Sequence, residues 1–296
     1  MPAHQIRLRS SVPASCLHIA ACQATQVAAV DANLAAASEE AVGTVLGEVQ
    51  ALGWPTMPAL SLLASLACEF PTYRELVQRA AARLGGRERT DLGRLAGALT
   101  ELEAAVKSQA PDLAEELRLR ERPLREQWEA RGPGLLMILA KQTEPQFVVE
   151  AAEAVLVAPY AGGHGLAHAA TNRVTFEAVL ANPVAELPEV VRLAWLAGQL
   201  NGELPRYVEP LTRPAERELL VSLAVVPAVL AGAEFVELAA CDQATVERAL
   251  TAWRLPVDAA TTAPVLWQWW TTFSESAIEW PVALAALEQM LAPPAS

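Results

Sequence analysis

Residues 173–178 read Arg-Val-Thr-Phe-Glu-Ala, and polar and apolar side chains alternate along this stretch. Alternation with a period of two is typical of a β-strand, because successive side chains of a strand point to opposite faces of the sheet. We interpret the stretch as a half-exposed strand. Short apolar runs at residues 135–139 and 154–157 are compatible with further strands. The middle of the chain is therefore expected to contain a small β-sheet.

The sequence on either side of these strands favours helices. Between Thr25 and Gln109 apolar residues recur at helical spacing, and glycine and proline interrupt the pattern often enough to predict four or five helices. The interruptions fall at residues 53–55, 70–71 and 85–86. Further helices are expected over residues 189–200 and 244–253, and from starts near Pro214 and Trp267. The predicted fold class is mainly α, with a small β-sheet in the middle of the chain (α+β).

The domain organisation follows from a change in composition and periodicity around residues 109–111. A chain of 296 residues is near the length at which one hydrophobic core divides into two. We predict an all-helical N-terminal part, residues 1–109, and an α+β part with C-terminal helices, residues 110–296. One fused core is the alternative. The charged helix after residue 110 is expected to kink at Pro123 and to end before Gly-Pro-Gly at residues 132–134.

Charge and hydropathy exclude two classes of partner. The 22 basic and 34 acidic residues give a net charge of −12, which repels the phosphate backbone of nucleic acids. Proline, glutamate or arginine breaks each apolar segment before it reaches the roughly 20 residues that cross a bilayer. We therefore expect an acidic, soluble protein with no nucleic-acid partner and no integral membrane span. These properties do not exclude a protein partner.

The cysteines bear on the cellular location. They are Cys16, Cys22, Cys68 and Cys241, without a close CxxC pair, which favours reduced thiols in a cytoplasmic protein. Residues 19–22, however, read Ile-Ala-Ala-Cys and resemble the lipobox of bacterial lipoproteins. This resemblance implies an exported lipoprotein acylated at Cys22, although the apolar run before it is interrupted. Otherwise the first residues are expected to form a frayed extension before the first helix.

Residues 160–168 contain two histidines four positions apart, His164 and His168, in a glycine-rich stretch. On a helix this spacing would place both imidazoles on one face, as a zinc site requires. The surrounding glycines favour a loop instead, and backbone N–H groups of a tight loop can bind an anion. The histidines are then loop residues beside a turn, without a metal. The carboxylates nearest in sequence are Glu177, Glu186 and Glu189.

The predicted elements from residue 135 to residue 200 come in the order helix, short strands, glycine-rich turn, amphipathic strand and helix. This layout resembles the core of zincin-type metallopeptidases, in which the last helix carries His-Glu-x-x-His and the glutamate activates a zinc-bound water. Residues 189–200 contain no histidine, so no catalytic residue can be carried over. A relative of that family would be a zinc-free pseudoenzyme with a cleft filled by Trp195. Otherwise the segment is an ordinary α+β core.

Tryptophans gather near the C-terminus, at Trp267, Trp269, Trp270 and Trp280. Their helical spacing favours burial, whereas exposed tryptophans would indicate a partner site. The sequence has no GxSxG, P-loop, dinucleotide-binding or EF-hand motif. We therefore expect a non-catalytic helical protein without a cofactor, which acts through protein–protein contacts or as an inactive relative of an enzyme family. The alternative is a metal-dependent hydrolase that binds zinc through His164 and His168.

Overall fold

The computed structural model describes residues 4–85, 89–179 and 184–292. Helices predominate in this part of the chain and accompany one small sheet, which confirms the predicted α+β class. The helices are α1 (Val12–Ala24), α2 (Ala32–Ala51), α3 (Thr56–Leu66), α4 (Tyr73–Leu84), α5 (Arg89–Gln109), α6 (Leu113–Gln142), α7 (Glu189–Ala197), α8 (Pro205–Val208), α9 (Arg217–Phe235), α10 (Gln243–Ala252), α11 (Ala259–Ser274) and α12 (Trp280–Met290). The strands are β1 (Gln5–Ser10), β2 (Ala151–Val157), β3 (Gly165–His168) and β4 (Arg173–Glu177), and two 3-10 helices span Ala169–Thr171 and Pro214–Glu216.

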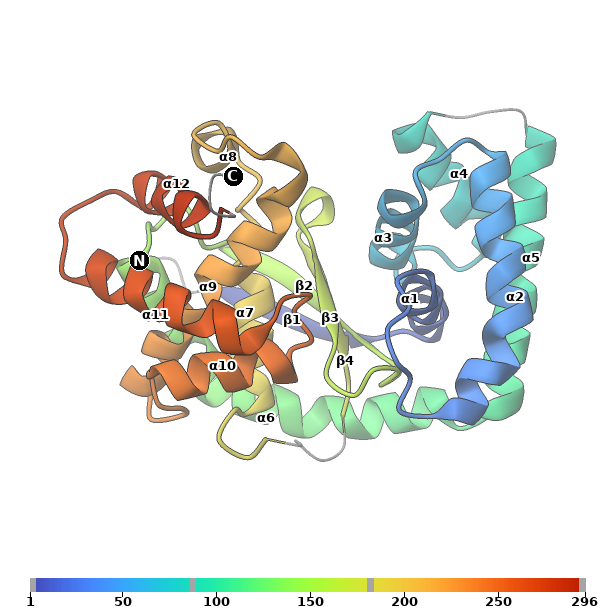
Figure 1. The fold of residues 1–296 in the computed structure, drawn as a ribbon. Helices are drawn as coiled ribbons and strands as arrows, with labels where there is room; N and C mark the ends of the chain where they lie inside the picture. The colour runs from blue at the N-terminus through green and yellow to red at the C-terminus, as the bar shows by residue number, and fades with distance from the viewer. Residues whose placement is uncertain (1–3, 86–88, 180–183, 293–296) are drawn as a thin grey trace. The chain divides into compact units, whose positions relative to one another are not determined.

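The sheet is mixed and has the strand order β1-β2-β4-β3 (Figure 1). Strands β2 and β4 run parallel, with Glu153 opposite Arg173 and Val157 opposite Glu177. Strand β3 pairs antiparallel with β4 and lies at the edge of the sheet. Because β4 is an inner strand, its C-terminal residue is held in register from both sides.

The chain divides into two compact units, each built from segments that are distant in sequence. We call Arg7–Pro123 with Glu153–Leu180 the N-terminal unit. The C-terminal unit comprises Met1–Ile6, Leu124–Ala152 and Ala181–Ser296. This division differs from the predicted boundary at residues 109–111, because the sheet segment after residue 153 belongs with the N-terminal helices.

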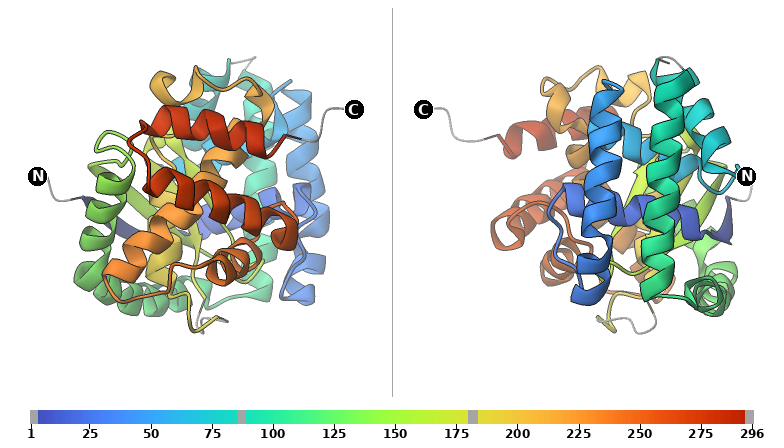
Figure 2. Two further views of the ribbon diagram at one scale, coloured as in Figure 1. Left: turned by 60° about the vertical axis from the view of Figure 1, so that its left-hand side comes forward. Right: turned by 90° about the vertical axis from the view of Figure 1, so that its right-hand side faces the viewer.

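Within the N-terminal unit, α2 and α5 lie side by side, and α1 packs against α2 and α3 (Figure 2). Helix α3 also contacts β3 and β4. The three predicted interruptions all separate helices, as the glycine and proline content indicated. Side-chain caps support two of the starts: Asp31 accepts backbone N–H bonds at the start of α2, and Thr72 accepts one from Glu75 at the start of α4.

The prediction for residues 132–139 was wrong. Helix α6 continues through the Gly-Pro-Gly stretch to Gln142, so the apolar run at 135–139 is helical and not a strand. A Cβ at position 132 would come within 2.4 Å of the Trp128 ring, so Gly132 makes room for a tryptophan one turn earlier. Pro133 lacks a backbone donor, yet the helix continues beyond it, with Leu135, Leu136 and Leu139 fully buried.

Two strand predictions also need correction. Residues 5–10 were expected to belong to a frayed extension, but they form β1, in which Ile6 and Leu8 are buried and alternate with exposed side chains. Strand β4 was expected to be half-exposed, yet all five of its residues are buried. Polar and apolar side chains do alternate along β4, but the polar ones point into a buried polar region and not to solvent.

In the C-terminal unit, α9 is the central helix and contacts α7, α10, α11 and α12. The stretch Pro214–Phe235 is long and apolar enough to cross a membrane, and 67% of its apolar window is buried inside the protein. A core helix passes the same test, so this helix is weak evidence for a membrane span. Of the four tryptophans expected to be buried, Trp269, Trp270 and Trp280 are buried, whereas Trp267 is half-buried.

Candidate metal centre

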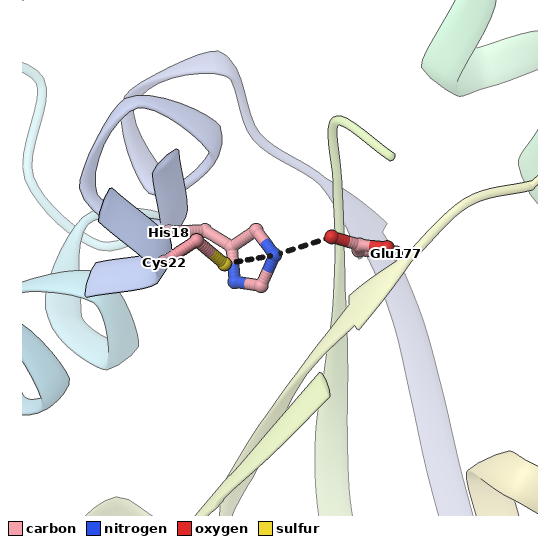
Figure 3. Close-up of side chains that lie close together, drawn as sticks. All are labelled: His18, Cys22 and Glu177. Atoms are coloured by element: carbon pink, nitrogen blue, oxygen red, sulfur yellow. Dashed lines mark hydrogen bonds and ion pairs between the residues drawn. The ribbon is translucent and has the colours of Figure 1, made fainter. Parts of the chain in front are cut away.

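Helix α1 positions two of the three side chains that converge in the N-terminal unit. It begins after Ser11, whose Oγ accepts the backbone N–H of Ala14 at 3.1 Å. Residues 14–22 are all buried. His18 and Cys22 are four residues apart on this helix, so both project from one face (Figure 3).

The third side chain is Glu177, the last residue of β4. Oε1 of Glu177 lies 2.9 Å from Nε2 of His18, and the same Nε2 lies 3.5 Å from Sγ of Cys22. Among the described residues, these three form a group whose potential ligand atoms all lie within 4.8 Å of one another. The side chains of His18 and Glu177 have no solvent exposure, and Cys22 is buried. A nitrogen, a sulfur and an oxygen therefore meet inside the protein.

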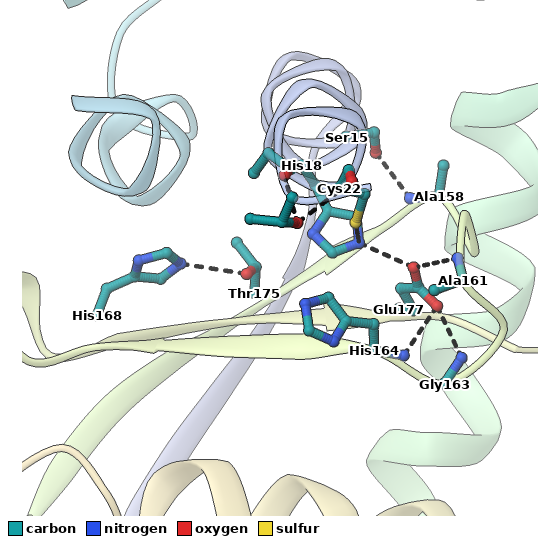
Figure 4. A network of polar contacts seen from close by, with 12 residues as sticks. Ser15, His18, Cys22, Ala158, Ala161, Gly163, His164, His168, Thr175 and Glu177 are labelled. Atoms are coloured by element: carbon teal, nitrogen blue, oxygen red, sulfur yellow. Dashed lines mark hydrogen bonds and ion pairs between the residues drawn. The ribbon is translucent and has the colours of Figure 1, made fainter. Parts of the chain in front are cut away.

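The carboxylate of Glu177 is anchored by the glycine-rich loop (Figure 4). Oε1 accepts the backbone N–H of Ala161 at 2.7 Å, and Oε2 accepts those of Gly163 at 2.7 Å and His164 at 2.9 Å. Gly163 has a φ of 135°, a conformation that favours glycine and turns its N–H inward. The loop thus binds an anion, as the sequence allowed, and the anion is a side chain of the protein itself.

Electrostatics favour the charged forms of the pair in the absence of an ion. Burial alone would lower the pKa of His18, but its hydrogen bonds to Cys22 and Glu177 and the negative charge of Glu177 outweigh burial and raise that pKa. Burial alone would raise the pKa of Glu177, but the bond to His18 and the N–H groups of the loop lower it. The ion-free site therefore holds an imidazolium–carboxylate pair.

The structure does not bring His164 and His168 together as a metal pair. Residues 165–168 form β3 and not a helix, so the four-residue spacing does not place the two imidazoles on one helical face. Nδ1 of His168 lies 2.7 Å from Oγ of Ser61, and its Nε2 lies 3.1 Å from Oγ1 of Thr175. Both nitrogens of His168 are thus engaged by hydroxyl groups, which identifies a hydrogen-bonded core histidine.

His164 lies beside His18 instead (Figure 4). The two ring centroids are 5.7 Å apart and the planes are tilted by 31°. Of the three carboxylates near these histidines in sequence, Glu177 joins the group, whereas Glu186 and Glu189 belong to the C-terminal unit. His18 and Cys22 were missed because the sequence analysis interpreted Cys22 as a core thiol or a lipid-attachment site. Their spacing in a buried helix was the available signal.

The helix compared with the zincin catalytic helix is α7, and its Trp195 is buried. Nε1 of Trp195 donates to the carbonyl oxygen of Ser222 at 2.9 Å, and its ring stacks on Trp253 with centroids 5.0 Å apart. The resemblance to zincins stays a prediction. No protein family, curated protein or solved structure matches this chain.

Proposed function

We propose that the protein binds one zinc ion through His18, Cys22 and Glu177, and that this ion has a structural, non-catalytic role. The observation that carries the proposal is the convergence of three different zinc-ligand atoms within 4.8 Å. Two ligands come from α1 and one from the end of β4, so a bound ion would join the first helix to the sheet. Imidazole, thiolate and carboxylate are the side chains that zinc sites use.

Two of the three separations between ligand atoms are close to those of an occupied site. Tetrahedral zinc with bonds of about 2.0–2.3 Å separates its ligand atoms by about 3.4 Å or slightly more. The separation between Nε2 of His18 and Sγ of Cys22 is already 3.5 Å. The separation between Nε2 and Oε1 of Glu177 is 2.9 Å, so this hydrogen bond must lengthen by about half an ångström.

The charges also match. A Cys22 thiolate and a Glu177 carboxylate supply two negative charges, and a neutral His18 adds none, so the buried zinc site is electrically neutral. Binding releases the thiol proton and the proton of the imidazolium to water. The loop N–H groups that hold Glu177 act as the outer-sphere partners that orient a ligand.

A cysteine-nucleophile mechanism fits the same residues less well. In a catalytic triad the histidine uses one ring nitrogen for the nucleophile and the other for the carboxylate. Here Nε2 of His18 faces both Cys22 and Glu177, and Nδ1 has no hydrogen-bond partner within the described part of the chain. Cys22 is also only 1% exposed, so a substrate has no access to the thiol.

Metal analysis of the purified full chain tests the proposal. After removal of any affinity tag and gel filtration, we expect about one zinc ion per chain by mass spectrometry. Cys22→Ser and His18→Gln should lower this to below about a tenth of an ion. Cys68→Ser, which changes a thiol of the same unit outside the group, is the matched control and should leave the content unchanged.

A second measurement tests the proposal if the purified protein contains no metal. Titration of the ion-free chain with zinc should give one tight site that disappears in Cys22→Ser. If wild type binds no zinc even when zinc is added, the three residues form only a hydrogen-bonded core and the proposal is wrong.

A further inference from the structure

His164 is fixed beside the proposed zinc site through its backbone. Its N–H donates to Oε2 of Glu177 at 2.9 Å, and its carbonyl oxygen accepts the N–H of Glu177 at 3.1 Å. The His164 ring lies 5.7 Å from that of His18. Residue 164 therefore cannot move away from Glu177 without breaking two hydrogen bonds, one to the carboxylate and one to the backbone of that residue.

The orientation of the ring adds a second observation. His164 as a residue is only half-buried, yet its Nδ1 atom is buried. Figure 4 shows the His164 ring beside the ring of His18.

Three ligands leave one position of tetrahedral zinc open. In catalytic sites water or substrate occupies that position, whereas structural sites have four protein ligands. The buried setting of His18, Cys22 and Glu177 gives substrate no access to an open position. His168 cannot supply the missing ligand without losing its bonds to Ser61 and Thr175.

We infer that His164 is the fourth zinc ligand, so that two imidazoles, one thiolate and one carboxylate enclose the ion. This inference rests on the proposed function. It assigns a closed coordination shell to the site and therefore a structural role to the metal. The glycine-rich loop then contributes to the site in two ways: its N–H groups bind Glu177, and it carries the ligand His164.

Cobalt(II) replaces zinc in such sites and reports its coordination through visible absorption, so the probe is the full chain loaded with Co²⁺ alone. Wild type should show the intense bands of a tetrahedral centre with a thiolate ligand. His164→Ala should bind Co²⁺ and Zn²⁺ more than about 100-fold more weakly, beyond the roughly 10- to 100-fold effect of losing an outer-sphere partner. Its bands should weaken as water enters, and added imidazole should restore them.

His168→Ala is the matched control, because it removes the neighbouring histidine and should leave the cobalt spectrum unchanged. If Cys22→Ser abolishes binding but His164→Ala keeps wild-type affinity and spectrum, the fourth-ligand inference is wrong and the zinc proposal stands. If wild type binds neither metal, both are wrong. X-ray absorption of zinc-loaded wild type is independent of any variant: scattering from two imidazoles supports the inference, and scattering from one overturns it.

Discussion

The interior of the N-terminal unit contains charged and imidazole side chains along β4, whereas the interior of the C-terminal unit is dominated by aromatic rings. On β4, Glu177 pairs with His18, Thr175 contacts His168, and Arg173 forms ion pairs with Glu153 and Glu69. These polar groups occupy the face that the sequence pattern assigned to solvent. Each of these groups has a specific partner, and most partners lie more than 100 residues away in the sequence or on another strand.

The aromatic interior of the C-terminal unit is organised by shape. The Phe147 ring packs edge-on against Tyr207 at 5.0 Å and Trp280 at 5.3 Å, and Trp269 lies 5.6 Å from Trp280. Trp195 and Trp253 form a separate stacked pair. Aromatic contacts are tolerant in direction but sensitive to lost volume, whereas buried polar groups are sensitive to lost partners. Variants in the two units should therefore fail in different ways.

The largest effect is expected from the aromatic interior. Trp195→Ala should lower the free energy of unfolding by about 3–5 kcal/mol, because it leaves a cavity and removes the bond to Ser222. Denaturant unfolding followed by circular dichroism measures this loss. Phe235→Ala in the same unit, at a side chain that is 70% exposed, should change stability by less than about 0.5 kcal/mol. A change that small at Trp195 would contradict its assignment to the core.

Glu177→Gln tests the polar interior with almost no change in volume. In ion-free protein it should cost about 2–3 kcal/mol, because the bonds from His18 and the loop N–H groups lose their charged acceptor. Chemical unfolding in the presence of a chelator measures this. The exposed Glu115→Gln in the same unit is the control. Equal stabilities of the two variants would show that the carboxylate charge contributes nothing to the fold.

The smallest effect is expected at His168 in the N-terminal unit, and its size should depend on pH. His168→Gln should cost about 1–2 kcal/mol at pH 7 through its bonds to Ser61 and Thr175. Burial, followed by the nearby charges of His18 and Arg173, lowers the pKa of His168 to about 3. As pH falls below about 6.5, His168 binds a proton in the unfolded chain but stays neutral in the folded chain. The free energy of unfolding of wild type therefore decreases as pH falls.

The glutamine variant lacks this penalty, so its deficit relative to wild type should shrink by about 1.4 kcal/mol for each pH unit below 6.5. Unfolding of both proteins at pH 7, 6 and 5 provides the measurement. A deficit that stays constant over this range would mean that His168 protonates freely in the folded protein.

Local signals determined much of the fold. Glycine and proline placed the three breaks that separate α2, α3, α4 and α5, and alternation identified β4, because both signals act within a few residues. The same alternation was present in β1 and could have revealed it. The stretch around Gly132 misled the sequence analysis, because whether a glycine ends a helix or accommodates Trp128 depends on side-chain packing.

By itself, the sequence determined a mainly helical chain with a small central sheet, and it indicated a glycine-rich loop able to bind an anion. Only the tertiary structure decided that Glu177 is that anion and that it meets a helix 159 residues earlier in the chain. It also separated His164 from His168. The physical reason is that periodicity specifies which face of an element a side chain occupies, whereas strand order and register decide which faces meet.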